Sequence, residues 1–376
     1  MFRTKAKGFA GLAVIAVLAL SLAACGDDDD SGDGGSGDSG SGDSAAKVGV
    51  ILPDTTTSPR WENNDRPSLQ KAFDDAGIES KIENAGGDTS KFASICDSMI
   101  NEGVSVLMIV NLDSESGSAC LSKAKDAGIP SIDYDRLTLG GGASYYVSFD
   151  NVVVGQLMGE GLQTCLDDAG KTKANIVMID GDPTDNNAAL FKEGYVGALQ
   201  PKVDSGDYTV VGEQTGKWDA DEAGKAFEQI FTQNDGKVDG VVSANDTMAG
   251  GIVARLEPNG LAGKVPVTGQ DASVEGLQRI LAGTQCMTVY KNTDLEADAA
   301  SKLAIALANQ DQDAADALVT GTVKDTEANV DVDSVLATPQ AIFQDQVKDV
   351  IADGYQTAAD VCTGEYAADC TKYGVQ

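Results

Sequence analysis

Short apolar runs alternate with amphipathic stretches along most of the chain after residue 46. Apolar runs of this length are typical of strands that are buried on both faces of a parallel sheet. They fall into two sets of five, separated by one long amphipathic stretch. The predicted strands span residues 47–52, 79–83, 104–110, 129–134 and 144–149, then 174–180, 208–213, 238–243, 265–269 and 285–290.

The stretches between the strands repeat apolar residues with the period of an α-helix. Alternating strands and amphipathic helices predict βαβ units, so the two sets of strands predict an α/β fold with two Rossmann-like lobes. One long doubly wound sheet is the alternative, although ten strands would make it unusually wide. The predicted helices cover residues 61–76, 88–102, 116–127, 151–168, 187–199, 219–234, 247–258, 273–282, 294–309 and 339–352.

Residues 1–24 have the pattern of a secretory signal. Three positive charges precede an apolar run from Gly8 to Ala24, which is short for a membrane span. Small residues before Cys25 resemble a bacterial lipoprotein cleavage box, so we expect Cys25 to carry lipid and residues 1–24 to be removed. An uncleaved anchor helix is the alternative. Residues 25–46 combine seven Asp with Gly and Ser and predict a flexible acidic linker.

The charge and the residue types that are missing restrict the function. The formal net charge is −32 and the sequence contains no His. A strongly acidic surface disfavours nucleic acid and anionic membranes as partners. Without His, Ser-His-Asp and Cys-His catalysis and most zinc sites are excluded. No Asp-rich segment completes a calcium loop and no Walker motif is present, so we expect no metal, no cofactor and no catalysis.

Cysteine usage indicates an oxidising location. Beyond Cys25 the number of cysteines is even, which favours disulfides in a protein outside the cytoplasm. Free buried thiols are the alternative. The candidate pairs are Cys362–Cys370, which are close in sequence, Cys96–Cys120, which lie on consecutive predicted helices, and Cys165–Cys286, which remain.

Polar and aromatic side chains follow the carboxyl ends of the predicted strands in both halves. Ligands of open α/β sheets bind at that edge. Carboxylate, amide and guanidinium groups bond neighbouring sugar hydroxyls in pairs, and the apolar face of a pyranose stacks on indole. These groups therefore favour a monosaccharide as the ligand. They are Asp54, Arg60, Trp61, Asn111, Asp135, Arg136, Asp150, Asn151, Asp182, Asp185, Asn186, Asn187, Trp218, Asn245, Asp246, Gln270, Asp271 and Lys291.

Each of these residues also has a purely structural interpretation. An Asp or Asn after a strand is commonly the N-cap of the next helix, and this interpretation applies to Asp150, Asn151, Asp219 and Asp246. The two Trp residues of the chain could be half-buried packing residues. What favours a binding site is that so many such groups gather at one predicted edge.

Short motifs recur at these strand ends: PRW (59–61), YDR (134–136), SFDN (148–151), PTDNNA (183–188), SANDTMAGG (243–251), GQDA (269–272) and TVYK (288–291). In sequence and order they resemble the D-xylose-binding proteins, a branch of the sugar-binding type I periplasmic binding proteins that feed ABC importers. The resemblance runs from about Lys47 to Gly354, and the tail beyond it has no counterpart. It implies sugar contacts from Arg60, Trp61, Asp135, Arg136, Asp185, Asn187, Trp218, Asn245, Asp271 and Lys291.

The resemblance also implies how the protein works. Two lobes joined by a three-segment hinge would close on one monosaccharide in the cleft between them, and a membrane permease would recognise the closed form. We expect a monomer, tethered near its ABC transporter permease by the lipid on Cys25. The expected crossovers lie near 150–154, 291–294 and 332–340. The first lobe would comprise 47–151 and 293–331, and the second 152–292 and 332–376.

Other functions remain open at this point. A sugar sensor that presents its ligand to a membrane receptor kinase would have the same sequence features. A carbohydrate enzyme would use paired carboxylates such as Asp135 and Asp271, but these are better explained as hydroxyl acceptors beside Arg136 and Lys291. A sugar-responsive transcription regulator needs a basic DNA-binding head, which this chain lacks. D-xylose is the expected sugar, and glucose, arabinose and galactose could use the same groups.

Overall fold

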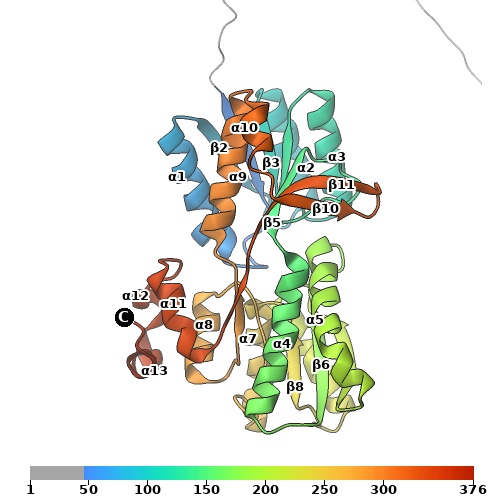
Figure 1. Cartoon of the computed structure of the whole chain (residues 1–376), viewed down its shortest axis with the longest axis vertical. Coiled ribbons are helices and arrows are strands. Elements are labelled where there is room, and N and C mark those ends of the chain that lie inside the picture. Colours follow the sequence, from blue (N-terminus) through green and yellow to red (C-terminus); the bar gives the residue numbers. More distant parts are fainter. Residues whose placement is uncertain (1–45) are drawn as a thin grey trace, which may run out of the picture. The chain divides into compact units, whose positions relative to one another are not determined.

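The computed structural model describes residues 46–376, which belong to one compact unit. The predicted signal peptide at 1–24, the lipid-bearing Cys25 and the linker up to residue 45 lie outside the described residues. Within the described part, no helix is long and apolar enough to cross a membrane. The unit contains two lobes, each built around its own parallel sheet (Figure 1).

The first lobe contains seven strands: β1 (Lys47–Leu52), β2 (Glu79–Asn84), β3 (Val106–Ile109), β4 (Ser131–Tyr134), β5 (Tyr145–Phe149), β10 (Gly321–Asp325) and β11 (Val330–Ala337). Their order across the sheet is β10-β11-β5-β4-β3-β1-β2. All neighbours are parallel except β10 and β11, which form an antiparallel hairpin. Strands β3, β4 and β5 are buried at every residue, because helices cover both faces of the sheet.

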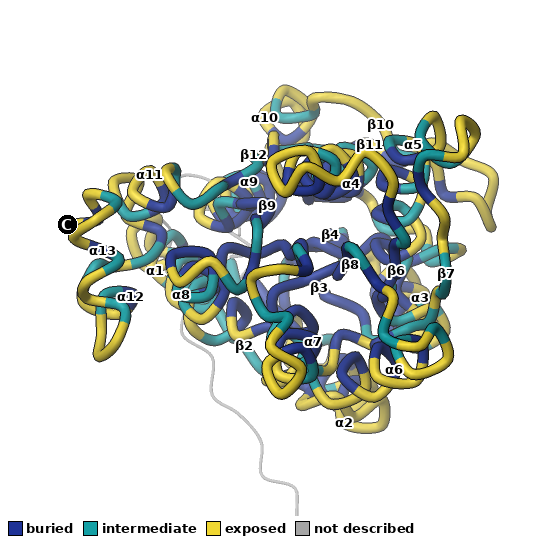
Figure 2. The backbone as a smooth tube through the Cα atoms, turned by 90° about the horizontal axis from the view of Figure 1, so that it is seen from below, coloured by how far each residue is buried: buried dark blue, intermediate teal, exposed yellow. Residues whose placement is uncertain are grey.

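The helices of this lobe are the π-helix η1 (Trp61–Asp65), α1 (Arg66–Ala76), α2 (Thr89–Asn101), α3 (Ser114–Asp126), α9 (Thr293–Ala308) and α10 (Gln312–Asp316). Successive strand residues point to opposite faces. Val48 and Val50 therefore pack with α1 and α9, whereas Ile51 packs with α2 and α3. Figure 2 shows the buried strands in dark blue, enclosed by helices with exposed yellow segments.

The second lobe contains β6 (Ala174–Asp180), β7 (Tyr208–Thr215), β8 (Gly240–Ser243), β9 (Thr288–Tyr290) and β12 (Gln340–Ile342). Its parallel sheet has the order β7-β6-β8, and β12 pairs antiparallel with β9. Isolated bridges from Val241 to Val267 and from Gln270 to Val289 connect the two pieces. Its helices are α4 (Asn151–Asp168), α5 (Asn186–Asp204), α6 (Ala220–Gln233), α7 (Asp246–Leu256), η2 (Glu257–Asn259), α8 (Val274–Ala282), η3 (Gln344–Gln346), α11 (Val347–Ala352), α12 (Ala358–Val361), η4 (Gly364–Tyr366) and α13 (Ala367–Tyr373).

Three segments connect the lobes, as expected. They run from β5 to α4 at Asp150, from β9 to α9 at Lys291 and Asn292, and from β11 to β12 at residues 338–339. The predicted α/β fold of two Rossmann-like lobes is therefore confirmed. The predicted end of the first lobe at residue 331 is wrong, because β11 pairs with β5 up to Ala337. The chain leaves the first sheet only after that strand.

Two predicted elements differ from the structure. The predicted helix at 339–352 begins instead with β12 and a short 3₁₀ turn, and only 347–352 is α-helical. The predicted strand at 265–269 makes a single bridge at Val267. The β10–β11 hairpin was not predicted, although residues 330–333 alternate apolar and polar side chains as a half-buried strand does.

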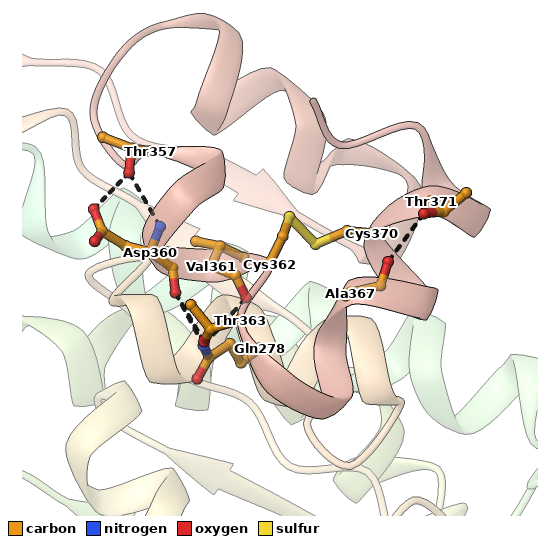
Figure 3. Close-up of a disulfide and its surroundings, with 9 residues drawn as sticks. All are labelled: Gln278, Thr357, Asp360, Val361, Cys362, Thr363, Ala367, Cys370 and Thr371. Carbon is orange, nitrogen blue, oxygen red and sulfur yellow. Dashed lines mark hydrogen bonds between the residues drawn. A yellow bond between two sulfur atoms is a disulfide. The ribbon is translucent and has the colours of Figure 1, made fainter.

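The three disulfides have the predicted pairing. Cys96–Cys120 joins α2 to α3, Cys165–Cys286 joins the end of α4 to the segment before β9, and Cys362–Cys370 closes the C-terminal tail. Figure 3 shows how this tail lies on α8, where the Gln278 amide donates to the carbonyls of Asp360 and Val361. The tail also contributes Val361 and Cys370 to an apolar cluster with α8.

Candidate functional site

A cavity between the two lobes collects the residues predicted to bind sugar. All ten of them line it, together with Thr57, Ser58, Phe191 and Gln270. Its free volume is about 30 Å³. The structure brings these side chains together from both lobes; that they contact a sugar stays a prediction.

The first-lobe rim is formed by the turn after β1. Asp54 folds this turn by accepting hydrogen bonds from the backbone N–H groups of Thr56 (2.7 Å) and Thr57 (2.6 Å). The indole N–H of Trp61 donates to the Thr57 hydroxyl at 3.3 Å. The guanidinium of Arg60 lies 4.4 Å from the centroid of the Trp61 ring, a distance at which cation–π attraction is effective. The turn therefore presents an oriented indole to the cavity.

Arg60 is held by three carboxylates. Its Nε and Nη2 donate to Asp65 at 2.9 and 2.7 Å, Nη1 donates to Asp135 at 2.7 Å, and Nη2 also donates to Glu296 at 2.6 Å. Burial raises the pKa of Glu296 to about 8, and repulsion from Asp135 adds to this shift although Arg60 opposes it. Every guanidinium nitrogen of Arg60 therefore donates to a carboxylate, and one of these bonds orients Asp135.

Asp135 is the central acceptor of the first lobe. Its backbone has φ = 63°, a left-handed conformation that is uncommon for a residue with a side chain. Its carboxylate accepts from Arg60, as above, and from the Asn187 amide of the second lobe at 3.1 Å. Burial alone would raise the pKa of Asp135, but Lys291, Arg60 and Arg136 outweigh it and hold the pKa at about 2. The site therefore keeps an ionised acceptor at neutral pH.

Asp185 of the second lobe both caps a helix and lines the cavity. It caps α5 by accepting from the backbone N–H of Asn187 at 2.9 Å. Its Oδ2 also accepts from the indole N–H of Trp218 at 3.2 Å and lies 2.9 Å from Nε of Arg136 of the first lobe. Burial raises the pKa of Asp185, although Arg136 opposes the shift. The N-cap interpretation and the site interpretation are thus compatible here.

Trp218 is fixed from two sides. The Phe191 ring meets it edge-on with 6.1 Å between the ring centroids. A side chain at Gly181 would place its Cβ 2.1 Å from the indole, so only glycine leaves room for the ring. The backbone at Trp218 is left-handed, with φ = 61°. This arrangement presents a buried indole to the cavity opposite Trp61 of the other lobe.

The remaining second-lobe groups also reach across to the first lobe. Asn245 caps α7 through its carbonyl oxygen and donates from its amide to the Thr57 carbonyl at 3.1 Å. Asp271 accepts from the Ser58 hydroxyl at 3.0 Å. The Lys291 ammonium lies 3.5 Å from the carboxylates of both Asp135 and Asp271. Lys291 therefore forms an ion pair with one acid from each lobe.

Three buried polar atoms at the cavity lack a hydrogen-bond partner in the described structure: Nε of Arg136, Oε1 of Gln270 and Oδ1 of Asp271. Buried polar groups are normally paired. Since Nε of Arg136 already lies 2.9 Å from the Asp185 carboxylate, the acceptors on Gln270 and Asp271 are the groups that remain for a polyhydroxylated ligand, whose hydroxyls can donate.

Sequence reasoning missed several functional neighbours. Phe191 could have been found, because it lies four residues after Asn187 on one helix face. Asp65 and Glu296 gave no signal, since both are charged residues within predicted helices and their contact with Arg60 depends on the fold. The N-cap interpretation suffices for Asp150 and Asp219, which cap α4 and α6 and do not line the cavity.

Comparisons with known proteins identify the family. Residues 48–312 match the periplasmic binding protein domain. A D-xylose-binding periplasmic protein of Escherichia coli K12 is 36% identical over 317 residues, which cover 84% of this chain and 92% of that protein. A multiple sugar-binding periplasmic receptor, ChvE, of Rhizobium radiobacter is 32% identical over 83% of this chain and 91% of its own.

A solved structure gives the same result. The carbohydrate transporter solute binding protein of Chloroflexus aurantiacus, in complex with D-glucose, superposes with a TM-score of 0.76 at 28% identity and covers 84% of this chain and 98% of its own. The chain therefore belongs to the periplasmic binding protein family. It is a sugar-binding, non-enzymatic component of the ABC importers that acts outside the cytoplasm, and the expected resemblance to D-xylose-binding proteins is confirmed.

Proposed function

We propose that this protein captures D-xylose by closing its two lobes and delivers it to the permease of an ABC importer. The observation that carries this proposal is the cavity between the lobes, with acids, amides and cations from both lobes and an indole on each side. A ligand that bonds both lobes stabilises the closed form by its differential affinity for that form. The permease would then distinguish loaded from empty protein.

The chemistry of the cavity supports an uncharged sugar. Asp135 and Asp271 face Lys291 at equal distances, and Arg136 faces Asp185, so the charges are largely paired within the protein. A neutral ligand leaves this pairing intact. Its hydroxyls would donate to the unpaired oxygens of Gln270 and Asp271. Burial of a sugar is favourable only when almost every hydroxyl is bonded.

The second candidate is a receptor for several monosaccharides. It is favoured by the relative that is named a multiple sugar-binding receptor and by the related structure with D-glucose. Titration calorimetry with D-xylose, D-glucose, L-arabinose and D-galactose separates the two candidates. A preference for D-xylose of tenfold or more would support the first, and similar affinities would support the second. If none of these sugars binds, both are wrong.

The cell-surface attachment is a further part of the proposal. Cys25 and the acidic linker up to residue 46 would tether a monomeric binding domain to the outer face of the cell membrane. Tethering raises the effective concentration of the binding protein at its permease. A sensor role, in which the loaded protein is presented to a membrane receptor kinase, would use the same closed form.

A further inference from the structure

The loop at residues 269–273 carries two cavity groups, Gln270 and Asp271, between a single β-bridge and the start of α8. Its backbone is left-handed at Asp271 (φ = 99°) and at Ala272 (φ = 49°). Such a conformation is unfavourable for residues with side chains and persists only where the surroundings hold it. Strand β9 holds the first part of the loop, because Val289 donates to the Gly269 carbonyl at 3.0 Å and accepts from the backbone N–H of Asp271 at 2.9 Å. The part after Asp271 needs another support.

Asp246 bonds both ends of the loop. Its backbone N–H donates to the Gln270 carbonyl at 3.0 Å. Its Oδ2 accepts from the backbone N–H of Ser273 at 2.9 Å and from the Thr288 hydroxyl at 3.1 Å. The Thr288 hydroxyl in turn accepts from the backbone N–H of Ala272 at 3.2 Å. The carboxylate thus holds, directly or through Thr288, the backbone of Ala272 and Ser273 just after Asp271.

The Asp246 carboxylate is tightly packed on both sides. A Cβ at Gly269 would lie 2.1 Å from Oδ1 of Asp246, and a Cβ at Gly276 would lie 2.3 Å from its Oδ2. Oδ1 also accepts from the Gln285 amide at 2.6 Å. The residue is 1% exposed. The carboxylate therefore packs directly against the backbone of the loop and of α8, where a longer acid would not fit.

The charge of Asp246 is only partly compensated. The facing cation is Arg279 on α8, whose Nη2 donates to the backbone carbonyl of Asp246 at 2.6 Å. The nearby acids are Asp271 on the loop and Glu275 on α8, and Tyr366 of η4 faces Arg279. Burial raises the pKa of Asp246 to about 6, against Arg279 and the bonds from Gln285 and Ser273, and repulsion from Asp271 adds to the shift.

We propose that Asp246 is a positioning residue for sugar recognition, which holds the loop at 269–273 so that Gln270 and Asp271 face the cavity. The inference rests on the proposed function. Asp246 does not line the cavity, and it does not cap α7, since Asn245 does. Neither direct sugar contact nor helix capping accounts for its burial and its bonds to the loop.

The test is calorimetry on Asp246→Asn with the same four sugars. The amide keeps the shape but turns a donor either toward the donors of Ser273 and Thr288 or toward the Gln285 amide, which also donates to this carboxylate. At neutral pH affinity should therefore fall roughly tenfold or more. In the parent, affinity should also fall as the pH is lowered through about 6, where Asp246 gains a proton. Asp246→Asn should lack this step. The matched control is Asp219→Asn, an exposed acid of the same lobe that caps α6.

A second variant keeps the proposal testable if Asp246→Asn does not fold. Thr288→Val is nearly isosteric and removes the hydroxyl that links Asp246 to Ala272; it should weaken binding several-fold in a folded protein. If folded variants at both positions keep the affinity and the pH profile of the parent, the role of Asp246 is wrong, and the proposed function is unaffected. A parent that binds none of the four sugars would overturn the proposed function, and the inference with it.

Discussion

Replacing Asp271 by Ala tests the core of the binding model. The carboxylate is 6% exposed, lies 3.5 Å from the Lys291 ammonium and accepts from Ser58 across the lobes. Two unit charges at that separation attract by roughly 5 kcal/mol at an effective dielectric constant of about 20. Part of this attraction is retained, because Asp135 also faces Lys291 at 3.5 Å.

The net effect on binding should therefore lie in the range found for truncated, buried charge partners, roughly 2–5 kcal/mol. The lower limit corresponds to about 30-fold in the dissociation constant. Calorimetry with D-xylose measures it directly. Asp271→Asn, which keeps the shape and one acceptor but not the charge, should lose less affinity than Asp271→Ala, and Asp219→Ala should lose stability only. If folded Asp271→Ala binds D-xylose within threefold of the parent, the assignment of this cleft is wrong.

Four further outcomes are expected. Arg136→Ala should weaken D-xylose binding by about 30-fold or more, because it strands the buried Asp185 carboxylate; unchanged calorimetric affinity would remove Arg136 from the site. Trp218→Ala should weaken binding by roughly three- to tenfold through lost stacking, with the ranking of neutral pyranoses partly kept in a competition assay. Cys25→Ser should release the protein from the membrane fraction, and a mutant that stays membrane-bound would contradict the lipidation. Burial raises the pKa of Asp133 from 3.8 to about 7, so the folded state binds this proton more tightly than the unfolded chain does. The free energy of unfolding should therefore fall as the pH rises from about 4 to about 7, and denaturant titrations should show a shallower fall for Asp133→Asn.

The sequence alone was sufficient for the architecture. Strands such as 47–52 and 104–110 are continuous apolar runs, and that pattern reports burial on both faces whatever the rest of the chain does. The carboxyl ends of parallel strands meet at one edge of each sheet, and the resemblance implied that the two edges face each other across a cleft. Residues as distant as Asp135 and Asp271 could therefore be assigned to one site. The disulfides followed from the even number of cysteines and the order of the predicted helices.

The lobe boundary and the roles of some strand-end residues could not be predicted, because the local sequence patterns there fit more than one structure. The end of the first lobe was placed too early because β11 follows a turn and alternates polar with apolar residues, so its pairing partner decides its lobe. Similarly, the N-cap interpretation and the site interpretation of Asp185 and Asn245 predict the same residue types at the same positions. Only the contacts across the cleft show that both residues cap a helix and also reach the first lobe at the cavity.

The residues that hold site residues in place could be identified only from the tertiary structure. Glu296 accepts a hydrogen bond from Arg60, which lies 236 residues away in the sequence. Asp246 contacts Ser273 and Thr288 only once the second lobe has folded. Glu296 carries no local signal, because an acid is ordinary within a helix. Asp246 follows a strand end, but that position does not show that it holds a loop. A residue that binds ligand can be inferred from its place at a strand end, which is a local property. A residue that positions another depends on distances between segments far apart in sequence, and those distances are set only when the chain packs.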